Sequence, residues 1–170
     1  CNKNYSILEP HVHAEQMKLA NITPEFQIDK TAFSTLTVNY NWRTACHVDS
    51  GDYRNGYSVI LVAEEGHYEG GFLGYPRFGV CVDVRHGDFL LKDPHQYHCN
   101  TPMKGSNWTR LSMVLYYREN MQKCYQPHSQ TGGNPLYEFV DVKLPKRRLD
   151  LGIYIRPETT DIKVIEEVLN

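Results

Sequence analysis

Tyr57-Ser58-Val59-Ile60-Leu61-Val62-Ala63 is a compact apolar run rich in β-branched residues. A strand with one face in water alternates between apolar and polar residues, whereas an unbroken apolar run of this length is typical of a strand covered on both faces. The run therefore predicts a strand inside a sheet. Glu64-Glu65-Gly66 supplies a turn directly after it.

Shorter strand signals lie on both sides of this run. Upstream, residues 32–42 alternate between two faces, which predicts another strand. Downstream, apolar runs are separated by Gly, Pro and Asp residues that favour turns, and these runs cover residues 72–75, 80–84, 89–92 and 111–117. Short strands at intervals of roughly ten residues indicate an antiparallel barrel or sandwich.

Helix signals are confined to the two ends of the chain. Residues 9–20 predict a short helix before Thr23-Pro24, and Thr160-Asp161 can cap a final helix that ends at Leu169. Residues 126–135 are rich in Gly, Pro, Ser and Gln, which predicts a mobile loop. We therefore predict one mainly β domain with flanking helices over residues 1–170, with its core at about 32–120 and a tail at 121–170.

Composition and charge narrow the function classes only slightly. A net charge of −2 provides no global basic field, so nucleic-acid contacts would come from local patches such as residues 143–148. Five cysteines without paired spacing favour free thiols and an intracellular, reducing compartment, which would be the nucleus in a eukaryote and the cytoplasm in a virus or bacterium. The sequence has neither an apolar run near 18 residues nor a leader pattern, so we expect no membrane span.

Metal-ligand types lie in the stretch Cys46-His47-Val48-Asp49-Ser50. In an extended strand, residues two apart point to the same face, so His47 and Asp49 can direct an imidazole and a carboxylate at one ion. A third ligand can come from His98 or from His95 in the same later loop. Two histidines and one carboxylate leave three positions open on an octahedral ion, which is the arrangement of non-haem Fe(II) oxygenases.

An anion-binding pair follows on the predicted strand at residues 111–117. Arg110 and Ser112 share one strand face, while Leu111 and Met113 share the other. A buried guanidinium is costly unless it meets an anion, and its fork suits the distal carboxylate of a 2-oxoacid. Arg118 is the alternative anion holder, although its place at the strand end favours a solvated role.

The pattern between these candidate ligands resembles the TET/JBP family of DNA-modifying Fe(II)/2-oxoglutarate dioxygenases. The resemblance covers roughly Phe33 to Tyr117 and rests on three motifs: Gly70-Gly71-Phe72-Leu73, Gly87-Asp88-Phe89-Leu90-Leu91 and His98-Cys99-Asn100-Thr101-Pro102. It implies a double-stranded β-helix, or jelly-roll, cupin-like core. It also implies Fe(II) held by His47, Asp49 and His98, in preference to His95. Arg110, with Ser112 beside it, would then hold the carboxylate of the co-substrate 2-oxoglutarate.

The same resemblance implies oxidation of the 5-methyl group of a pyrimidine in DNA. Because a methyl group inside a duplex cannot reach a buried iron, we expect a flipped base as the substrate. The sequence leaves the oligomeric state open, and we expect a monomer. Some relatives contact the base with an acidic residue three positions after the metal-binding Asp, and that position here is Asp52. A carboxylate there can accept from the amine of cytosine, which favours 5-methylcytosine over thymine, unless Asp52 is only a turn residue. Asn100 is a further candidate for a contact to base or phosphate.

Two other function classes stay open from the sequence. An oxygenase that acts on a protein side chain or a small metabolite would use the same iron site. A non-catalytic jelly-roll binding module would keep the fold and lack the metal.

Overall fold

The computed structural model describes residues 1–124, 138–143 and 150–155. The chain divides into two compact units, residues 1–126 and residues 127–170. In the second unit, β10 (Glu138–Lys143) and β11 (Asp150–Ile155) pair as an antiparallel hairpin, which was not predicted from the sequence. The expected loop at 126–135 and the expected helix at 160–169 lie outside the described residues. The single domain over residues 1–170 stays a prediction.

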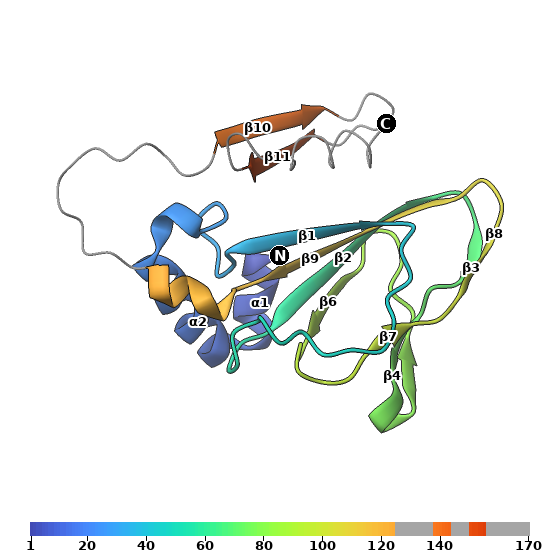
Figure 1. The fold of residues 1–170 in the computed structure, drawn as a ribbon, viewed down its shortest axis with the longest axis horizontal. Helices are drawn as coiled ribbons and strands as arrows, with labels where there is room; N and C mark the ends of the chain where they lie inside the picture. The colour runs from blue at the N-terminus through green and yellow to red at the C-terminus, as the bar shows by residue number, and fades with distance from the viewer. Residues whose placement is uncertain (125–137, 144–149, 156–170) are drawn as a thin grey trace. The chain divides into compact units, whose positions relative to one another are not determined.

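A four-stranded antiparallel sheet is the main element of the first unit (Figure 1). Its strands are, in spatial order, β1 (Thr35–Tyr40), β9 (Thr109–Tyr116), β2 (Ser58–Glu65) and β6 (Phe89–Lys92). All four strands were predicted from the sequence, with ends that differ by up to three residues. The predominance of antiparallel strands confirms the predicted mainly β class.

Strand β2 is buried on both faces, as its apolar run predicts. Val59 belongs to one apolar cluster, whereas Ile60 and Val62 belong to another. Because successive side chains of a strand point to opposite faces, β2 contributes to two separate core layers.

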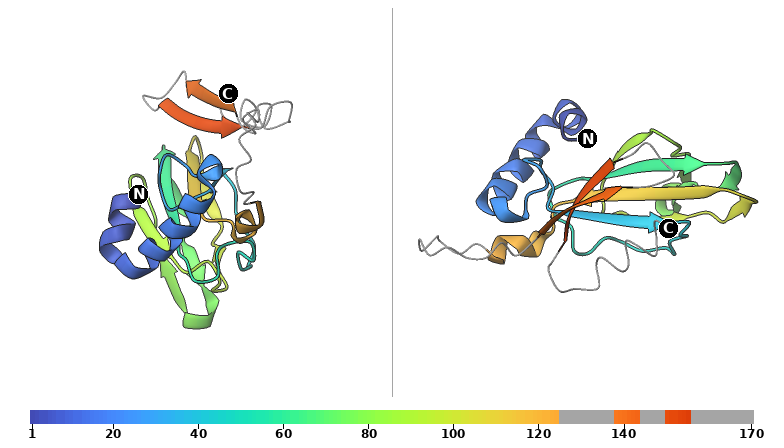
Figure 2. Two further views of the ribbon diagram at one scale, coloured as in Figure 1. Left: turned by 90° about the vertical axis from the view of Figure 1, so that its left-hand side faces the viewer. Right: turned by 90° about the horizontal axis from the view of Figure 1, so that it is seen from above.

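Helices cover one face of this sheet (Figure 2). The predicted helix at residues 9–20 is confirmed as α2 (Pro10–Ile22), and α1 (Asn2–Leu8) and the 3₁₀ helix η1 (Pro24–Phe26) flank it. Tyr5 and Phe33 are fully buried here. The partly buried residues packed against this cluster are Val12, Met17, Ile28, Tyr57, Leu61, Phe89, Leu91 and Leu115.

Shorter strands cover the opposite face. Strand β4 (Leu73–Tyr75) pairs with both β5 (Val80–Val82) and β7 (Cys99–Asn100), while β3 (Tyr68–Gly70) pairs with β8 (Met103–Gly105). The second apolar cluster is formed by Ile60, Val62, Leu73 and Val84, and it joins β2 of the main sheet to β4. This sheet-on-sheet packing is the sandwich that the strand spacing predicts.

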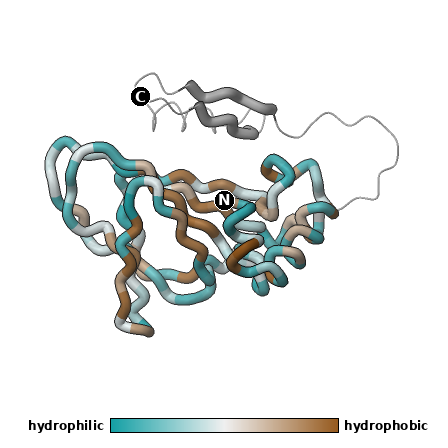
Figure 3. Tube along the Cα trace, turned by 180° about the vertical axis from the view of Figure 1, so that it is seen from behind, coloured by the Kyte–Doolittle hydropathy of each residue, from teal (hydrophilic) through white to brown (hydrophobic). Residues whose placement is uncertain are grey.

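Two 3₁₀ helices complete the first unit. They are η2 (Pro76–Phe78), between β4 and β5, and η3 (Glu119–Cys124), after β9. The most hydrophobic segments follow the central strands, and the connections are mostly hydrophilic (Figure 3).

Among the described residues, no helix has both the length and the hydropathy needed to cross a membrane. Cys1, Cys46, Cys81 and Cys99 are free thiols. The reducing compartment stays a prediction.

Candidate metal centre and its pocket

A backbone pairing places the candidate ligands. The N–H of His47 donates to the carbonyl of His98 at 3.0 Å, and the N–H of His98 donates to the carbonyl of His47 at 2.9 Å. The N–H of Asp49 donates to the carbonyl of Pro94 at 3.0 Å. These bonds hold residues 47–49 beside the loop that carries His98. Residues 47–49 belong to none of the named strands. The extended geometry used to relate His47 and Asp49 is limited here to an isolated bridge at His47, and their side chains still point at a common centre.

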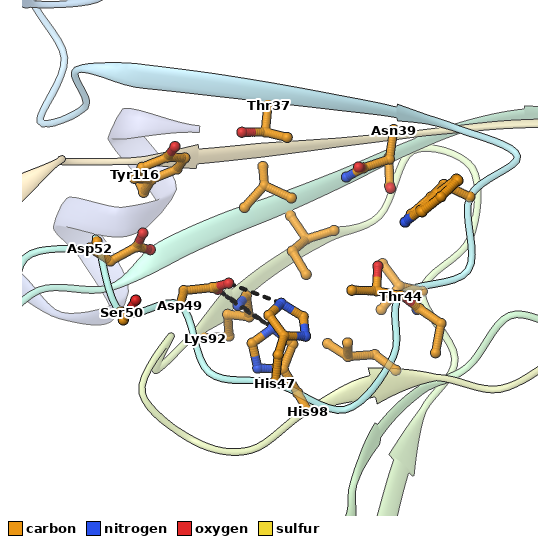
Figure 4. A pocket seen from close by; sticks show the side chains of 18 of the residues that line it. Thr37, Asn39, Thr44, His47, Asp49, Ser50, Asp52, Lys92, His98 and Tyr116 are labelled. Carbon is orange, nitrogen blue, oxygen red and sulfur yellow. Dashed lines mark hydrogen bonds and ion pairs between the residues drawn. The ribbon is translucent and has the colours of Figure 1, made fainter.

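His47, Asp49 and His98 bring one donor atom each within 4.8 Å of one another. Nε2 of His47 lies 3.1 Å from Oδ1 of Asp49, and Nε2 of His98 lies 3.5 Å from Oδ2 of the same carboxylate (Figure 4). Two donor atoms at right angles on an ion with bonds of about 2.1 Å are about 3 Å apart. The spacing of the three side chains therefore suits adjacent positions on one metal ion.

In each of the two imidazoles, a hydrogen bond made by Nδ1 leaves Nε2 facing the Asp49 carboxylate. Nδ1 of His47 lies 2.8 Å from the carbonyl oxygen of Ala45, and Nδ1 of His98 lies 2.8 Å from that of Gln96. A carbonyl oxygen can only accept, so Nδ1 donates in both rings and a neutral ring has its lone pair on Nε2. Imidazoles that bind metals are commonly oriented in this way.

The donor set calls for a positive charge at its centre. With its proton on Nδ1, His47 directs a lone pair at a carboxylate oxygen only 3.1 Å away, and two acceptors at that distance repel each other unless a cation or proton lies between them. Fe(II) fits this set of two imidazoles and one carboxylate. His95, the alternative ligand, instead contacts Asp93 at 3.3 Å and lies outside the cluster.

Lys92 enters this cluster and was missed in the sequence. Its Nζ lies 2.6 Å from Oδ2 of Asp49 and 3.0 Å from Nε2 of His98. Burial acts to raise the pKa of Asp49, but the Lys92 ammonium and the two imidazoles outweigh it and lower that pKa below its usual value. Burial and the Lys92 charge lower the pKa of His98, which keeps its ring neutral. Lys92 shares a face of β6 with the partly buried Leu90, but a strand of four residues is too short for alternation alone to show which face meets the pocket.

Arg110 and Ser112 lie on β9 with 5% and 8% of their surfaces exposed. Both line the same pocket as the candidate ligands, while Leu111 faces away from it, as the predicted alternation requires. Nε of Arg110 has no hydrogen-bond partner among the residues that the structure describes. A buried guanidinium nitrogen without a partner is the expected feature of an anion site whose ligand comes from outside the chain. Binding of 2-oxoglutarate by this pair stays a prediction.

Asp52 is buried, with 6% of its surface exposed, and its Oδ2 has no hydrogen-bond partner in the described part of the chain. Burial and the nearby Asp49 carboxylate raise its pKa to about 7, against the opposing effect of Lys92 and Arg118. Asp52 forms an isolated antiparallel bridge with Arg118, an exposed residue that lines the same pocket. Its burial makes Asp52 more than a turn residue.

One pocket of about 430 Å³ is lined by the three candidate ligands and by Lys92, Arg110, Ser112 and Asp52. Asp52 and Tyr116 lie at one end, Asn39 and Thr44 lie at the other, and the candidate ligands lie between them (Figure 4). All seven predicted site residues line it, namely His47, Asp49, Asp52, His98, Asn100, Arg110 and Ser112. Sequence reasoning missed other lining residues, including Thr37, Asn39, Thr44, Lys92 and Tyr116. Of these, Thr37 and Asn39 could have been found from the polar face of the alternating strand β1.

Comparisons with known proteins agree with this geometry. Residues 1–119 match the Tet_JBP family, described as the oxygenase domain of the 2OGFeDO superfamily. Thymine dioxygenase JBP1 of Trypanosoma brucei brucei is 42% identical over 108 residues, which are 60% of this chain and 13% of that protein. Thymine dioxygenase JBP1 of Leishmania major is 40% identical over 119 residues, or 66% of this chain and 14% of that protein.

A solved structure shares the fold. It is NgTET1 in complex with 5mC DNA, with a TM-score of 0.58 and 16% sequence identity over 71% of this chain and 48% of that one. The chain thus spans only a small part of its curated relatives and about half of this structure. The family match covers well over half of the chain. The chain therefore belongs to the Tet_JBP family of oxygenase domains, in a superfamily that uses Fe(II) and 2-oxoglutarate.

Proposed function

We propose that this chain is an Fe(II)/2-oxoglutarate-dependent dioxygenase that hydroxylates the 5-methyl group of a pyrimidine in DNA. The observation that carries the proposal is the pocket itself. Two imidazoles and a carboxylate lie there within 4.8 Å of one another, beside a buried arginine whose Nε has no partner among the described residues. The names of its relatives as thymine dioxygenases support a pyrimidine base as the substrate.

His47, Asp49 and His98 would hold the iron, and their carbonyl-bonded Nδ1 atoms keep both Nε2 lone pairs directed at it. Bound iron supplies the activation of dioxygen, coupled to decarboxylation of 2-oxoglutarate to succinate. Arg110 would hold the distal carboxylate of 2-oxoglutarate through charge-assisted hydrogen bonds, with the Ser112 hydroxyl beside it.

The methyl group must leave the base stack to reach this pocket, so the substrate is a flipped nucleotide. We place the base at the Asp52 end, because Arg110 and the amide of Asn39 lie towards the other end, where the co-substrate carboxylate binds. The exposed Arg118 beside Asp52 is placed to meet a DNA phosphate. Asn100 lines the pocket and is a further contact for base or phosphate.

Two bases fit this proposal, and each has an observation in its favour. The carboxylate form of Asp52 accepts from the exocyclic amine of 5-methylcytosine, the base favoured by the sequence. The acid form donates to the O4 atom of thymine, the base named in both curated relatives. Because the pKa of Asp52 is raised to about 7, both forms are accessible near neutral pH.

A product assay tests the proposal. Protein loaded with Fe(II) is incubated with 2-oxoglutarate, ascorbate and duplexes that carry either thymine or 5-methylcytosine as the only 5-methylpyrimidine, and nucleosides are then measured by mass spectrometry. We expect a 5-hydroxymethyl product from at least one base and none from Asp49→Ala. Succinate without any oxidised nucleoside would instead favour a protein or metabolite substrate. Failure to bind Fe(II) and 2-oxoglutarate would favour a non-catalytic module.

A further inference from the structure

Lys92 places a buried positive charge inside the candidate metal centre. Its side chain is 2% exposed, and Nζ contacts Asp49 and His98 at 2.6 and 3.0 Å. A buried ammonium is stable only when acceptors surround it. Here the surrounding acceptors are two of the three candidate metal ligands.

The backbone fixes this position. Lys92 ends β6, where it pairs with Ser58 of β2, so its main chain is part of the principal sheet. In the same strand, Leu90 pairs with Ile60 and packs against the second apolar cluster, which includes Ile60 and Leu73. Strand alternation therefore directs Lys92 into the pocket.

The two ligands differ in what they can share with Lys92. Asp49 has two oxygens, and Oδ1 faces His47 while Oδ2 accepts from Lys92. It can therefore bind an ion through Oδ1 and keep Lys92 on Oδ2. His98 has a single lone pair on Nε2, because its Nδ1 donates to Gln96. That lone pair can serve either Lys92 or a metal ion.

We propose that Lys92 is a positioning residue that competes with the metal ion for His98, holds Asp49 through its other oxygen, and thereby makes metal binding weak and reversible. An entering ion must displace Nζ from His98 and then lie a few ångströms from a retained positive charge, which repels it. The inference rests on the proposed metal site. In this view three residues provide the metal affinity, and Lys92 lowers it.

Titration with Mn(II), followed by the electron paramagnetic resonance signal of the free ion, tests this proposal. Lys92→Met keeps the apolar stem and removes the charge, Lys92→Arg keeps the charge, and Lys18→Met is the matched change on the exposed face of α2. We expect Lys92→Met to bind Mn(II) at least about tenfold more tightly than wild type. Lys92→Arg and Lys18→Met should stay within about threefold of wild type. An unchanged or weaker affinity in Lys92→Met would overturn the proposal.

A measurement on the wild-type protein covers the case in which Lys92→Met does not fold. In protein labelled with ¹³C and ¹⁵N at lysine, the Lys92 side-chain signal, assigned through Lys92→Arg, should shift when Zn(II) is added, while the Lys18 signal stays in place. A Lys92 signal that does not respond to bound Zn(II) would refute the competition.

Asp49→Ala separates this inference from the proposed function. If wild type binds Mn(II) and Asp49→Ala does not, the metal site stands, and the result for Lys92→Met alone decides the role of Lys92. If neither wild type nor Lys92→Met binds Mn(II) or Zn(II), both the metal site and the competition are refuted.

Discussion

His47 and His98 bond to each other through their main chains, with each N–H donating to the carbonyl of the other, and their rings lie with centroids 4.4 Å apart. The backbone therefore sets the separation of the two imidazoles. Neither side chain is needed to hold the two segments together.

The first prediction follows from this pairing. His47→Ala should abolish Mn(II) binding and turnover while the unfolding midpoint stays within a few degrees of wild type, because the backbone bridge remains and the His47 side chain is 38% exposed. Circular dichroism melts and metal titration measure the two effects. Retained metal binding would contradict the assignment of His47 as a ligand. His95→Ala is the control, and this variant should still bind Mn(II).

The second prediction concerns Arg110. Arg110→Met should weaken 2-oxoglutarate binding to the Mn(II)-loaded protein by about tenfold to a hundredfold, the equivalent of about 1.5–3 kcal/mol for a lost hydrogen bond to a charged group. Isothermal titration calorimetry gives the affinity. The control is Arg77→Met, on the exposed 3₁₀ helix η2. Equal affinity in Arg110→Met and wild type would remove Arg110 from the co-substrate site.

The third prediction concerns base choice and pH. Because the pKa of Asp52 is raised to about 7, the acid form dominates below neutrality and the carboxylate above it. The ratio of 5-methylcytosine to thymine turnover should therefore rise between pH 6 and pH 8, measured with both bases in one reaction. Asp52→Asn, which does not titrate, should flatten this rise. A ratio that changes equally in both proteins would exclude Asp52 as the group that reads the base.

The fourth prediction concerns stability. The pKa of Asp52 is about 7 in the folded chain and 3.8 ordinarily, so between these values the folded state binds more protons than the unfolded state, and stability falls as pH rises. Relative to Asp52→Asn, wild type should lose about 2–4 kcal/mol of unfolding free energy from pH 4 to pH 8, since each pKa unit corresponds to about 1.4 kcal/mol. Urea unfolding with chelator present measures the difference. A constant difference across this range would show that Asp52 is not buried as described.

Local patterns in the sequence predicted the features that depend on alternation. The apolar run of β2 and the opposite directions of Arg110 and Leu111 are examples, because the period of two is a property of the strand itself. The motif around His98 likewise favoured His98 over His95, and the structure brings His98 into the cluster with His47 and Asp49.

Features that depend on long-range packing were not predictable in the same way. The chain at His47 lies beside residue 98 through an isolated bridge, and no local pattern reports such a bridge. Asp52, which is buried, pairs with Arg118, far along the chain. Lys92 ends a four-residue strand, too short for alternation alone to show which face meets the pocket.

The two-sided burial of β2 has a practical consequence for protein engineering. Val59 packs in the cluster that contacts the helices, whereas Ile60 lines the pocket. Neighbouring positions of one strand thus affect different properties, so a change that reshapes the pocket at Ile60 can be combined with a stabilising change on the helix-facing side. Variants with an altered substrate range can in this way be built without accumulating the loss of stability that usually accompanies them.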